Sequence, residues 1–132
     1  MSAPLVLVVE DNATLQRLAE LHLKHLGLEV HTALNGREAV QAASRQHYSL
    51  ILMDISMPEM DGIEATKAIR KMERRLGGHV PIVAVTGIDT REHCLAAGMD
   101  DYAVKPANYK QIVDRWLPAR DGQPSWRAES RI

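Results

Sequence analysis

The sequence has little of three features that would each point to a particular class of protein. It contains one cysteine, Cys94, which cannot form a disulfide bond within the chain, and this favours a reducing compartment. Its formal net charge is −1, so there is no excess of positive charge to attract nucleic acid. No apolar run approaches the roughly 18 residues of a membrane span, and acidic residues come too early for a signal peptide. We therefore expect a cytoplasmic globular domain that contacts neither membrane nor nucleic acid directly.

Strand and helix patterns alternate along the 132 residues, a length that fits one domain. Residues 4–9 form a continuous apolar run, which is typical of a strand covered on both faces. Five strands alternating with five helices predict an α/β fold, (βα)5, in which helices cover both faces of a doubly wound five-stranded parallel sheet. The expected strands are 4–9, 29–33, 49–53, 81–85 and 101–104, and the expected helices are 12–26, 36–46, 61–76, 89–97 and 108–117.

The first of these helices carries an apolar stripe that we expect to pack on the sheet. The stripe has helical spacing, and Gly27 is the expected C-terminal cap. Leu21 and Leu23 lie beside the stripe, and if exposed they would form an apolar docking patch near the strand ends. The stripe consists of Leu15, Leu18, Ala19, His22 and Leu26.

Charged and polar side chains follow four of the expected strands. In open α/β sheets, ligands bind outside the carboxyl ends of the strands, near the point at which the strand order reverses. With the strand order 2-1-3-4-5, the first and third strands are neighbours there, so three carboxylates and one ammonium would share one cleft. The residues are Glu10 and Asp11 after the first strand, Asp54 after the third, Thr86 after the fourth and Lys105 after the fifth.

Three carboxylates in one cleft imply a bound cation. They repel one another, and a set of oxygen ligands suits a hard ion such as Mg²⁺, or Mn²⁺. Once the charge is screened, one carboxylate can act as a nucleophile toward a phosphoryl group. Lys105 would then pair with the phosphoryl oxygens, and Thr86 would donate a hydrogen bond from its hydroxyl.

Four of these residues also have a simpler structural interpretation. Glu10 and Asp11 could cap the helix that follows them, and Asp54 could open a turn before Pro58. Thr86 could be an ordinary residue at the end of a strand. The complete set favours the functional interpretation, because the turn begins several residues after Asp54 and leaves that position unexplained.

Four motifs, in this order, resemble the receiver domain of two-component response regulators. They are VVEDN, MDISMPEMDG, AVTG and YAVKPA, and the resemblance covers about residues 4–117. It implies a flavodoxin-like receiver fold with the strand order 2-1-3-4-5. We expect a receiver domain over residues 1–118 and a tail or linker over residues 119–132, where Pro, Gly and charged residues show no periodicity.

The resemblance also implies a role for each site residue. Asp54 would accept a phosphoryl group from a phosphohistidine. Tyr102 would follow Thr86 inward on phosphorylation and so change a binding surface. A cis peptide between Lys105 and Pro106 would aim the lysine at the phosphoryl group. The Mg²⁺ ligands would be Asp11, Asp54 and the backbone carbonyl of Ser56, with Glu10 holding the ion through water.

A protein of this family would act in a His-to-Asp relay and would catalyse only its own phosphorylation and dephosphorylation. Its partner would be a histidine kinase or a histidine phosphotransfer protein, and it would be a monomer or weak dimer. It would be either a free-standing regulator or the receiver of a hybrid histidine kinase. Two alternatives stay open. One is a metal-dependent phosphatase, although Ser56 stands where such enzymes usually have a second acid, and the other is a binding module that works without phosphorylation.

Overall fold

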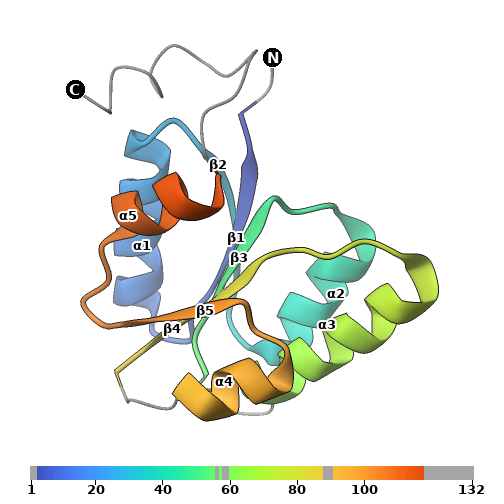
Figure 1. Ribbon diagram of the computed structural model, residues 1–132. Helices are drawn as coiled ribbons and strands as arrows, with labels where there is room; N and C mark the ends of the chain where they lie inside the picture. The colour runs from blue at the N-terminus through green and yellow to red at the C-terminus, as the bar shows by residue number, and fades with distance from the viewer. Residues whose placement is uncertain (1–2, 56, 58–59, 88–90, 118–132) are drawn as a thin grey trace.

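Strands and helices alternate along the computed structural model, which describes residues 3–55, 57, 60–87 and 91–117 (Figure 1). This confirms the expected alternation. None of the helices in these ranges is long and apolar enough to cross a membrane. The strands are β1 (Leu5–Val9), β2 (Glu29–Ala33), β3 (Leu50–Met53), β4 (Ile82–Thr86) and β5 (Asp101–Val104), and the helices are α1 (Ala13–His25), α2 (Gly36–Arg45), α3 (Gly62–Leu76), α4 (Arg91–Ala97) and α5 (Tyr109–Trp116).

The five strands form one parallel sheet with the expected order β2-β1-β3-β4-β5. β1 lies between β2 and β3, so that Val9 is opposite both Ala33 and Met53. The chain adds β2 on one side of β1 and then continues with β3 on the other side. The strand order therefore reverses between β1 and β3, which places the carboxyl ends of these two strands side by side.

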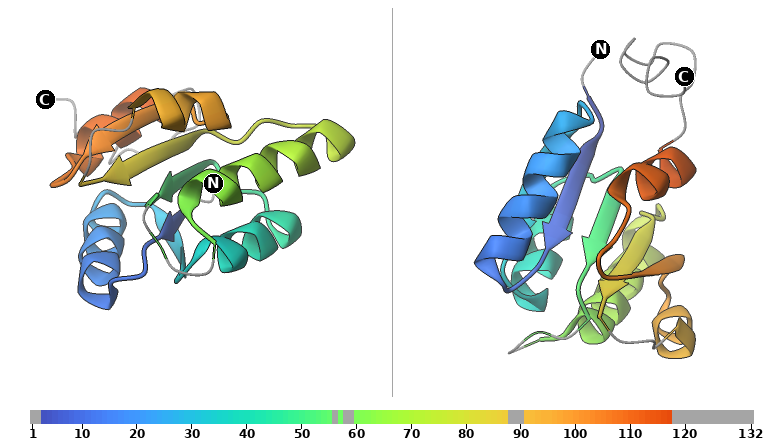
Figure 2. Two further views of the ribbon diagram at one scale, coloured as in Figure 1. Left: turned by 90° about the horizontal axis from the view of Figure 1, so that it is seen from below. Right: turned by 90° about the vertical axis from the view of Figure 1, so that its left-hand side faces the viewer.

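Alternate residues of the strands face two separate hydrophobic clusters. Leu7 and Val9 pack in the cluster that includes residues of α2, α3 and α4, whereas Val6 and Val8 pack in the cluster that includes residues of α1 and α5. Figures 1 and 2 show the same arrangement, with the sheet between the two groups of helices. Both faces of β1, β3 and β4 are covered, which explains why their sequences are continuously apolar.

Four of the helices begin with a side chain that caps the first turn. Each capping oxygen accepts a hydrogen bond from the backbone N–H three residues later, which satisfies a group that the helix itself leaves without a partner. Gly27 follows α1 with φ of 88°, so it ends that helix as expected, in a conformation that favours glycine. The capping residues are Asn12 for α1, Asn35 for α2, Asp61 for α3 and Asn108 for α5.

The buried face of α1 differs from the expected stripe, which was wrong by about one helical position. Ala19 and Leu23 are buried, whereas Leu15 and Leu18 are 40% and 50% exposed. Leu21 is also exposed. Leucines occur on more than one face of this helix, so their spacing alone does not determine which face packs on the sheet.

Candidate functional site

The acidic residues that follow β1 and β3 meet at the carboxyl edge of the sheet. The N–H of Asp54 donates to the carbonyl of Val9 at 3.0 Å, which holds the end of β3 against the end of β1. One carboxylate oxygen from each of Glu10, Asp11 and Asp54 lies within 4.8 Å of the others. Glu10 and Asp54 are each 6% exposed, whereas Asp11 is exposed. The cluster is therefore open to solvent on the side of Asp11.

Lys105 brings a positive charge to this acidic cluster from the end of β5. Its Nζ lies 2.6 Å from Glu10 Oε1 and 3.5 Å from Asp54 Oδ2. Its backbone N–H donates to the carbonyl of Thr86 at 2.7 Å, and its peptide bond to Pro106 is cis. Burial favours the neutral amine, but the hydrogen bond to Glu10 and the charges of Asp54 and Glu10 outweigh it and raise the pKa of Lys105. The side chain is therefore a cation in this site.

Gln16 fixes the backbone at Glu10, a role that nothing in the sequence pattern indicates. Its Nε2 donates to the carbonyls of Glu10 and Ala33, in both cases at 3.1 Å. The N–H of Asn12 donates to Glu10 Oε2 at 3.1 Å, and Asn12 is the residue that caps α1. The Glu10 side chain is thus held beside Lys105 and does not serve as the helix cap.

Gly62 allows the start of α3 to pack against the backbone of Asp54. A Cβ atom at this position would lie 2.2 Å from the carbonyl oxygen of Asp54, a distance that real Cβ atoms do not reach. The N–H of Gly62 donates to the carbonyl of Ile55 at 3.2 Å. This close approach fixes the chain directly after β3, and with it the position of Asp54.

The two expected switch residues lie on adjacent strands. Thr86 is the last residue of β4 and is buried, and Tyr102 on β5 is partly buried against the cluster that contains residues of α2, α3 and α4. Tyr102 lies opposite Ala84 in the strand register, and Thr86 lies opposite Val104. Ser56, whose carbonyl is an expected metal ligand, lies outside the described residues.

The acidic cluster fits a hard divalent cation. Carboxylate oxygens are the ligands that Mg²⁺ and Mn²⁺ prefer, and Mg²⁺ usually keeps several waters in addition to one or two protein carboxylates. Lys105 can balance only one of the three negative charges, so a divalent cation would remove the remaining repulsion. Glu10, Asp11 and Asp54 are the described residues that would hold it.

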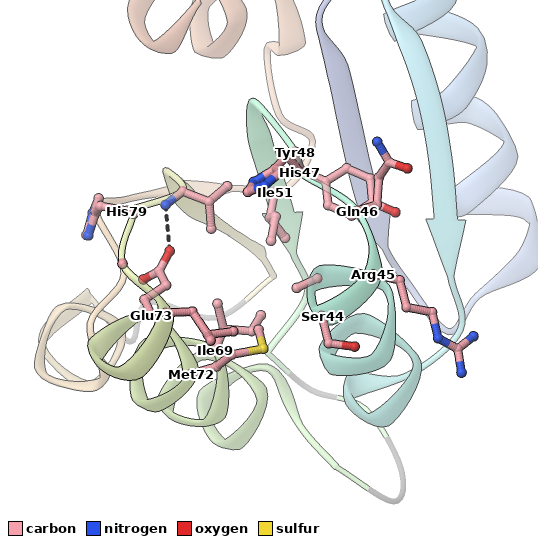
Figure 3. Close-up of a pocket in the computed structure, with 15 residues that line it drawn as sticks. Ser44, Arg45, Gln46, His47, Tyr48, Ile51, Ile69, Met72, Glu73 and His79 are labelled. Atoms are coloured by element: carbon pink, nitrogen blue, oxygen red, sulfur yellow. Dashed lines mark hydrogen bonds between the residues drawn. The ribbon is translucent and has the colours of Figure 1, made fainter.

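A separate cavity of about 410 Å³ lies at the other end of the sheet, where β3 and β4 begin (Figure 3). Ile69 and Met72 line it, and the Glu73 carboxylate in its wall accepts a hydrogen bond from the N–H of Val80 at 2.7 Å. The residues described as lining this cavity include no member of the acidic cluster. The cavity is therefore not part of the candidate site.

Comparison with known families and proteins gives a consistent match. The family model described as the response regulator receiver domain matches residues 6–117. Sensor protein GacS of Pseudomonas syringae pv. syringae is 38% identical over 137 residues, which cover 97% of this chain and 15% of that protein. Hybrid signal transduction histidine kinase I of Dictyostelium discoideum is 40% identical over 117 residues, which cover 83% of this chain and 7% of that protein. The chain thus spans only a small part of these relatives.

Solved receiver domains have the same fold. The receiver domain of sensor histidine kinase PA1611 from Pseudomonas aeruginosa PAO1, which holds a magnesium ion in its active-site cleft, is 40% identical with a TM-score of 0.80 and covers 89% of this chain and 100% of its own. The receiver domain of the Arabidopsis thaliana histidine kinase CKI1, complexed with Mg²⁺ and BeF3⁻, is 35% identical with a TM-score of 0.76 and covers 89% and 91%.

A third solved structure contains a partner protein. It is the complex of the Saccharomyces cerevisiae histidine phosphotransfer protein Ypd1 with the receiver domain of the response regulator Ssk1, and it matches at 29% identity with a TM-score of 0.80, covering 99% of this chain and 93% of that chain. The strand order, the acidic cluster and the family match over most of the sequence agree with one another. This chain therefore belongs to the response regulator receiver domains, the phosphoacceptor domains of two-component signalling.

Proposed function

We propose that Asp54 is the phosphoacceptor, and that it takes a phosphoryl group from a phosphohistidine while Mg²⁺ or Mn²⁺ is bound beside it. The observation that carries this proposal is the convergence of Glu10, Asp11 and Asp54 within 4.8 Å, with the Lys105 ammonium 3.5 Å from Asp54. Glu10 already accepts hydrogen bonds at both of its oxygens, and Asp11 is exposed. Asp54 combines burial with a fixed backbone, which suits a nucleophile that must be held in line with its target.

The reaction forms one bond and breaks another. An Asp54 carboxylate oxygen attacks phosphorus, and the bond between phosphorus and the donor imidazole nitrogen breaks. The electron pair of that bond returns to the imidazole, which takes up a proton from solvent. The bound cation would screen the carboxylates and the phosphoryl oxygens. Lys105 pairs with a phosphoryl oxygen, and the Thr86 hydroxyl donates a hydrogen bond to another.

We also propose that phosphorylation of Asp54 changes the conformation of residues on β4 and β5. A phosphoryl group on Asp54 would draw the hydroxyl of Thr86 toward it, and Tyr102 would follow. These residues lie at the end of β4 and on β5, so their movement would alter the surface formed by α4, β5 and α5. The backbone carbonyl of Ser56 would complete the metal site.

The partner we propose is a histidine phosphotransfer protein or a histidine kinase. The relatives are far longer kinases, which supports a receiver region of a hybrid histidine kinase, although a free-standing regulator would use the same site. The exposed Leu15, Leu18 and Leu21 of α1 offer an apolar docking surface, and Leu15 lines a small cavity together with Glu10 and Asp54. We propose that the chain acts in the cytoplasm as a monomer or weak dimer, and that it has no enzymatic activity beyond its own phosphorylation and dephosphorylation.

Phosphorylation by a small donor tests the proposal directly. The chain is incubated with Mg²⁺ and acetyl phosphate, and a gain of one phosphoryl group is followed by intact-protein mass spectrometry. We expect the adduct in the wild type and in Asp114→Asn, a control at a half-buried carboxylate on α5, and no adduct in Asp54→Asn. An adduct that persists in Asp54→Asn would place the phosphoacceptor elsewhere.

The two alternatives predict different outcomes in the same experiment. A metal-dependent phosphatase would hydrolyse added phosphoesters over many turnovers. A module that works without phosphorylation would form no adduct, and its amide NMR spectrum would not respond to Mg²⁺ with beryllofluoride.

A further inference from the structure

The first turn of α2 contacts the chain that leads into α3. The N–H of Gly36 donates to the carbonyl of Met60 at 2.9 Å. Gly36 is the first residue of α2, so its N–H is one of the groups that the helix itself leaves without a partner. A Cβ atom at position 36 would lie 2.3 Å from the Met60 carbonyl oxygen, a distance that real Cβ atoms do not reach. The contact therefore requires glycine at this position.

The same stretch of chain contacts Asp54 two residues later. Gly62 lies against the Asp54 carbonyl, where a Cβ atom would come within 2.2 Å, and its N–H donates to the carbonyl of Ile55 at 3.2 Å. Residues 60–62, which we call the bridging segment, thus touch α2 through Met60 and the end of β3 through Gly62. This segment joins α2 to the acidic cluster, although α2 contributes no residue to the cluster.

We propose that Gly36 is a positioning residue for the phosphoacceptor site, and that it acts on Asp54 through the bridging segment. This inference rests on the proposed function, because it takes Asp54 as the phosphoacceptor beside a divalent cation. It adds to that function a part of the fold, the N-terminus of α2, that neither the acidic cluster nor Lys105 includes. Gly36 contributes no group to the reaction, and its effect is on the position of the Asp54 carboxylate.

The first turn of α2 is held in place by its own hydrogen bonds. Asn35 Oδ1 accepts the N–H of Glu38 at 2.9 Å, and Glu38 Oε1 accepts the N–H of Leu34 at 2.8 Å. This reciprocal pair fixes the residue at which the helix begins. Ala39, in the same turn, is fully buried in the cluster that includes residues of α2, α3 and α4. The first turn therefore gives the bridging segment a rigid support.

The bridging segment can absorb little displacement. Met60 packs against the same hydrophobic cluster, and Asp61 Oδ1 accepts the N–H of Glu64 at 2.9 Å, which caps α3. The closest atom to a Cβ at position 36 would be a backbone oxygen, so no change of side-chain rotamer removes the overlap. Gly62 already lies against Asp54 and leaves no room there. A displacement that begins at Met60 therefore reaches the backbone of Asp54, and the Asp54 side chain moves with it.

Titration calorimetry with Mg²⁺ alone tests this inference without any turnover. We expect Gly36→Ala to bind Mg²⁺ about tenfold more weakly than the wild type, because groups that orient a metal ligand typically contribute that much. Ala43→Gly, toward the C-terminus of the same helix, should bind like the wild type. The two variants separate positioning from helix stability, since alanine favours a helix and glycine weakens one. Helix stability alone would give the opposite order of affinities.

NMR spectroscopy measures whether the effect passes through the bridging segment. In the absence of Mg²⁺, the amide signals of Gly62 and Asp54 should shift in Gly36→Ala and stay in place in Ala43→Gly. The wild type gives a second measurement that needs no variant. By linkage, saturation with Mg²⁺ should slow hydrogen exchange of the Gly36 N–H roughly fivefold or more. The N–H of Gln46, at the other end of α2, should exchange as before.

The results that would contradict the inference can be told apart. If Gly36→Ala binds Mg²⁺ within about twofold of Ala43→Gly, α2 does not position the site, and an unchanged exchange rate at Gly36 leads to the same conclusion. If Gly36→Ala loses affinity while the signals of Gly62 and Asp54 stay in place, the effect does not pass through the bridging segment. These results leave the proposed function intact. If the wild type binds no Mg²⁺, the proposed cofactor itself fails.

Discussion

The pKa of Lys105 depends on two opposing effects, burial of the side chain and the nearby negative charges. Burial alone would lower its pKa, but the hydrogen bond to Glu10 and the charges of Asp54 and Glu10 raise it above the ordinary value of 10.5. The folded chain therefore holds this proton more tightly than the unfolded chain does. The resulting stabilisation is complete below the unfolded-state pKa and is lost as the pH rises through the folded-state pKa.

We predict that the free energy of unfolding falls with rising pH above about 10.5, and that the fall is smaller in Glu10→Gln. Removal of the Glu10 charge lowers the pKa of Lys105 toward the unfolded value, so less stabilisation remains to be lost. Urea unfolding at several alkaline pH values measures this difference. Tyr109 titrates in the same range, and both burial and the Glu10 charge raise its pKa, so the two chains are compared in a Tyr109→Phe background. Identical pH profiles would show that Glu10 does not hold the proton on Lys105.

The absence of a side chain at Gly62 lets the start of α3 pack directly against the Asp54 carbonyl. Gly62→Ala should lower the free energy of unfolding by about 1–3 kcal/mol, because its Cβ must displace the Asp54 carbonyl. It should also weaken Mg²⁺ binding, because the displaced backbone carries the Asp54 side chain. Gly87→Ala is the matched control, since its Cβ would meet no atom of the described residues within 4 Å. Urea unfolding and calorimetry measure the two effects, and equal behaviour of the two variants would contradict the prediction.

The sequence pattern locates the charged site residues but not the residues that support them. Glu10, Asp54 and Lys105 can be found because each follows a strand, and the topology then brings strand ends together. Gln16 could not be found in this way. Its importance depends on an amide that reaches the carbonyl of Ala33, 17 residues away, and no local pattern records such a contact.

At the scale of single elements, two leucines of α1 differ in burial and should therefore differ in their contribution to stability. Leu23 is fully buried between helix and sheet, whereas Leu18 is 50% exposed. Leu23→Ala should lower the free energy of unfolding by about 2–5 kcal/mol, because it removes buried methyl groups and leaves a cavity. Leu18→Ala should change it by no more than about 0.5 kcal/mol. Urea unfolding of both variants measures the contrast, and a larger loss for Leu18→Ala would support the original stripe.

The proposed docking surface on α1 adds a functional test to the same helix. Leu18→Asp should leave the Mg²⁺ affinity and the reaction with acetyl phosphate unchanged, because the acidic cluster is intact. It should slow phosphoryl transfer with a histidine phosphotransfer protein about tenfold or more, since it places a charge in an apolar contact. Transfer assays with both donors measure the difference, and an equal loss with both would show that the substitution damages the site itself.

A buried arginine connects α3 to the segments that precede β4 and β5. Helical periodicity does not indicate a buried arginine at this position. Arg70 donates to Glu73 and Asp100 at 2.7 Å each, and to the carbonyls of Gly98 and Val80 at 2.8 Å each. Its side chain is only 10% exposed. The guanidinium therefore ties the C-terminal half of α3 to the loop before β4 and to the turn between α4 and β5.

Arg70→Ala should lower the free energy of unfolding by about 3–5 kcal/mol, because it leaves the carboxylates of Glu73 and Asp100 with fewer partners in a largely buried setting. Arg75→Ala, an exposed arginine on the same helix, is the control and should have little effect. Mg²⁺ affinity should stay the same in both variants at temperatures where they are folded, since Arg70 lies near the start of β4 and the acidic cluster near its end. Chemical unfolding and calorimetry measure these quantities.

At the scale of the whole molecule, the sheet could be predicted because three of its strands are continuously apolar, unlike the segments between them. β1, β3 and β4 are continuous apolar segments, and the helices between them carry polar faces. β5, with Asp101 and Tyr102, is less apolar, so its composition indicates a strand less clearly. The buried face of α1 could not be predicted, because leucines lie on more than one face of this helix.

The boundary after residue 118 stays a prediction. Leu117 is the last buried residue of the described part of the chain, and it packs in the cluster that includes residues of α1 and α5. We expect a chain that ends at residue 118 to keep its free energy of unfolding within about 0.5 kcal/mol and to bind Mg²⁺ like the full sequence. Urea unfolding and calorimetry of the shortened chain test this, and a clear loss of stability would assign residues 119–132 to the fold.

The pair formed by Lys105 and Glu10 joins residues 95 positions apart in the sequence. A contact between residues so far apart in the chain carries a large entropic cost of loop closure. A chain whose fifth strand has not yet joined the sheet would present Asp54 without its neighbouring ammonium. On the proposed mechanism, such a chain would lack the lysine that pairs with a phosphoryl oxygen, so a chain phosphorylated on Asp54 would be one in which β5 has joined the sheet.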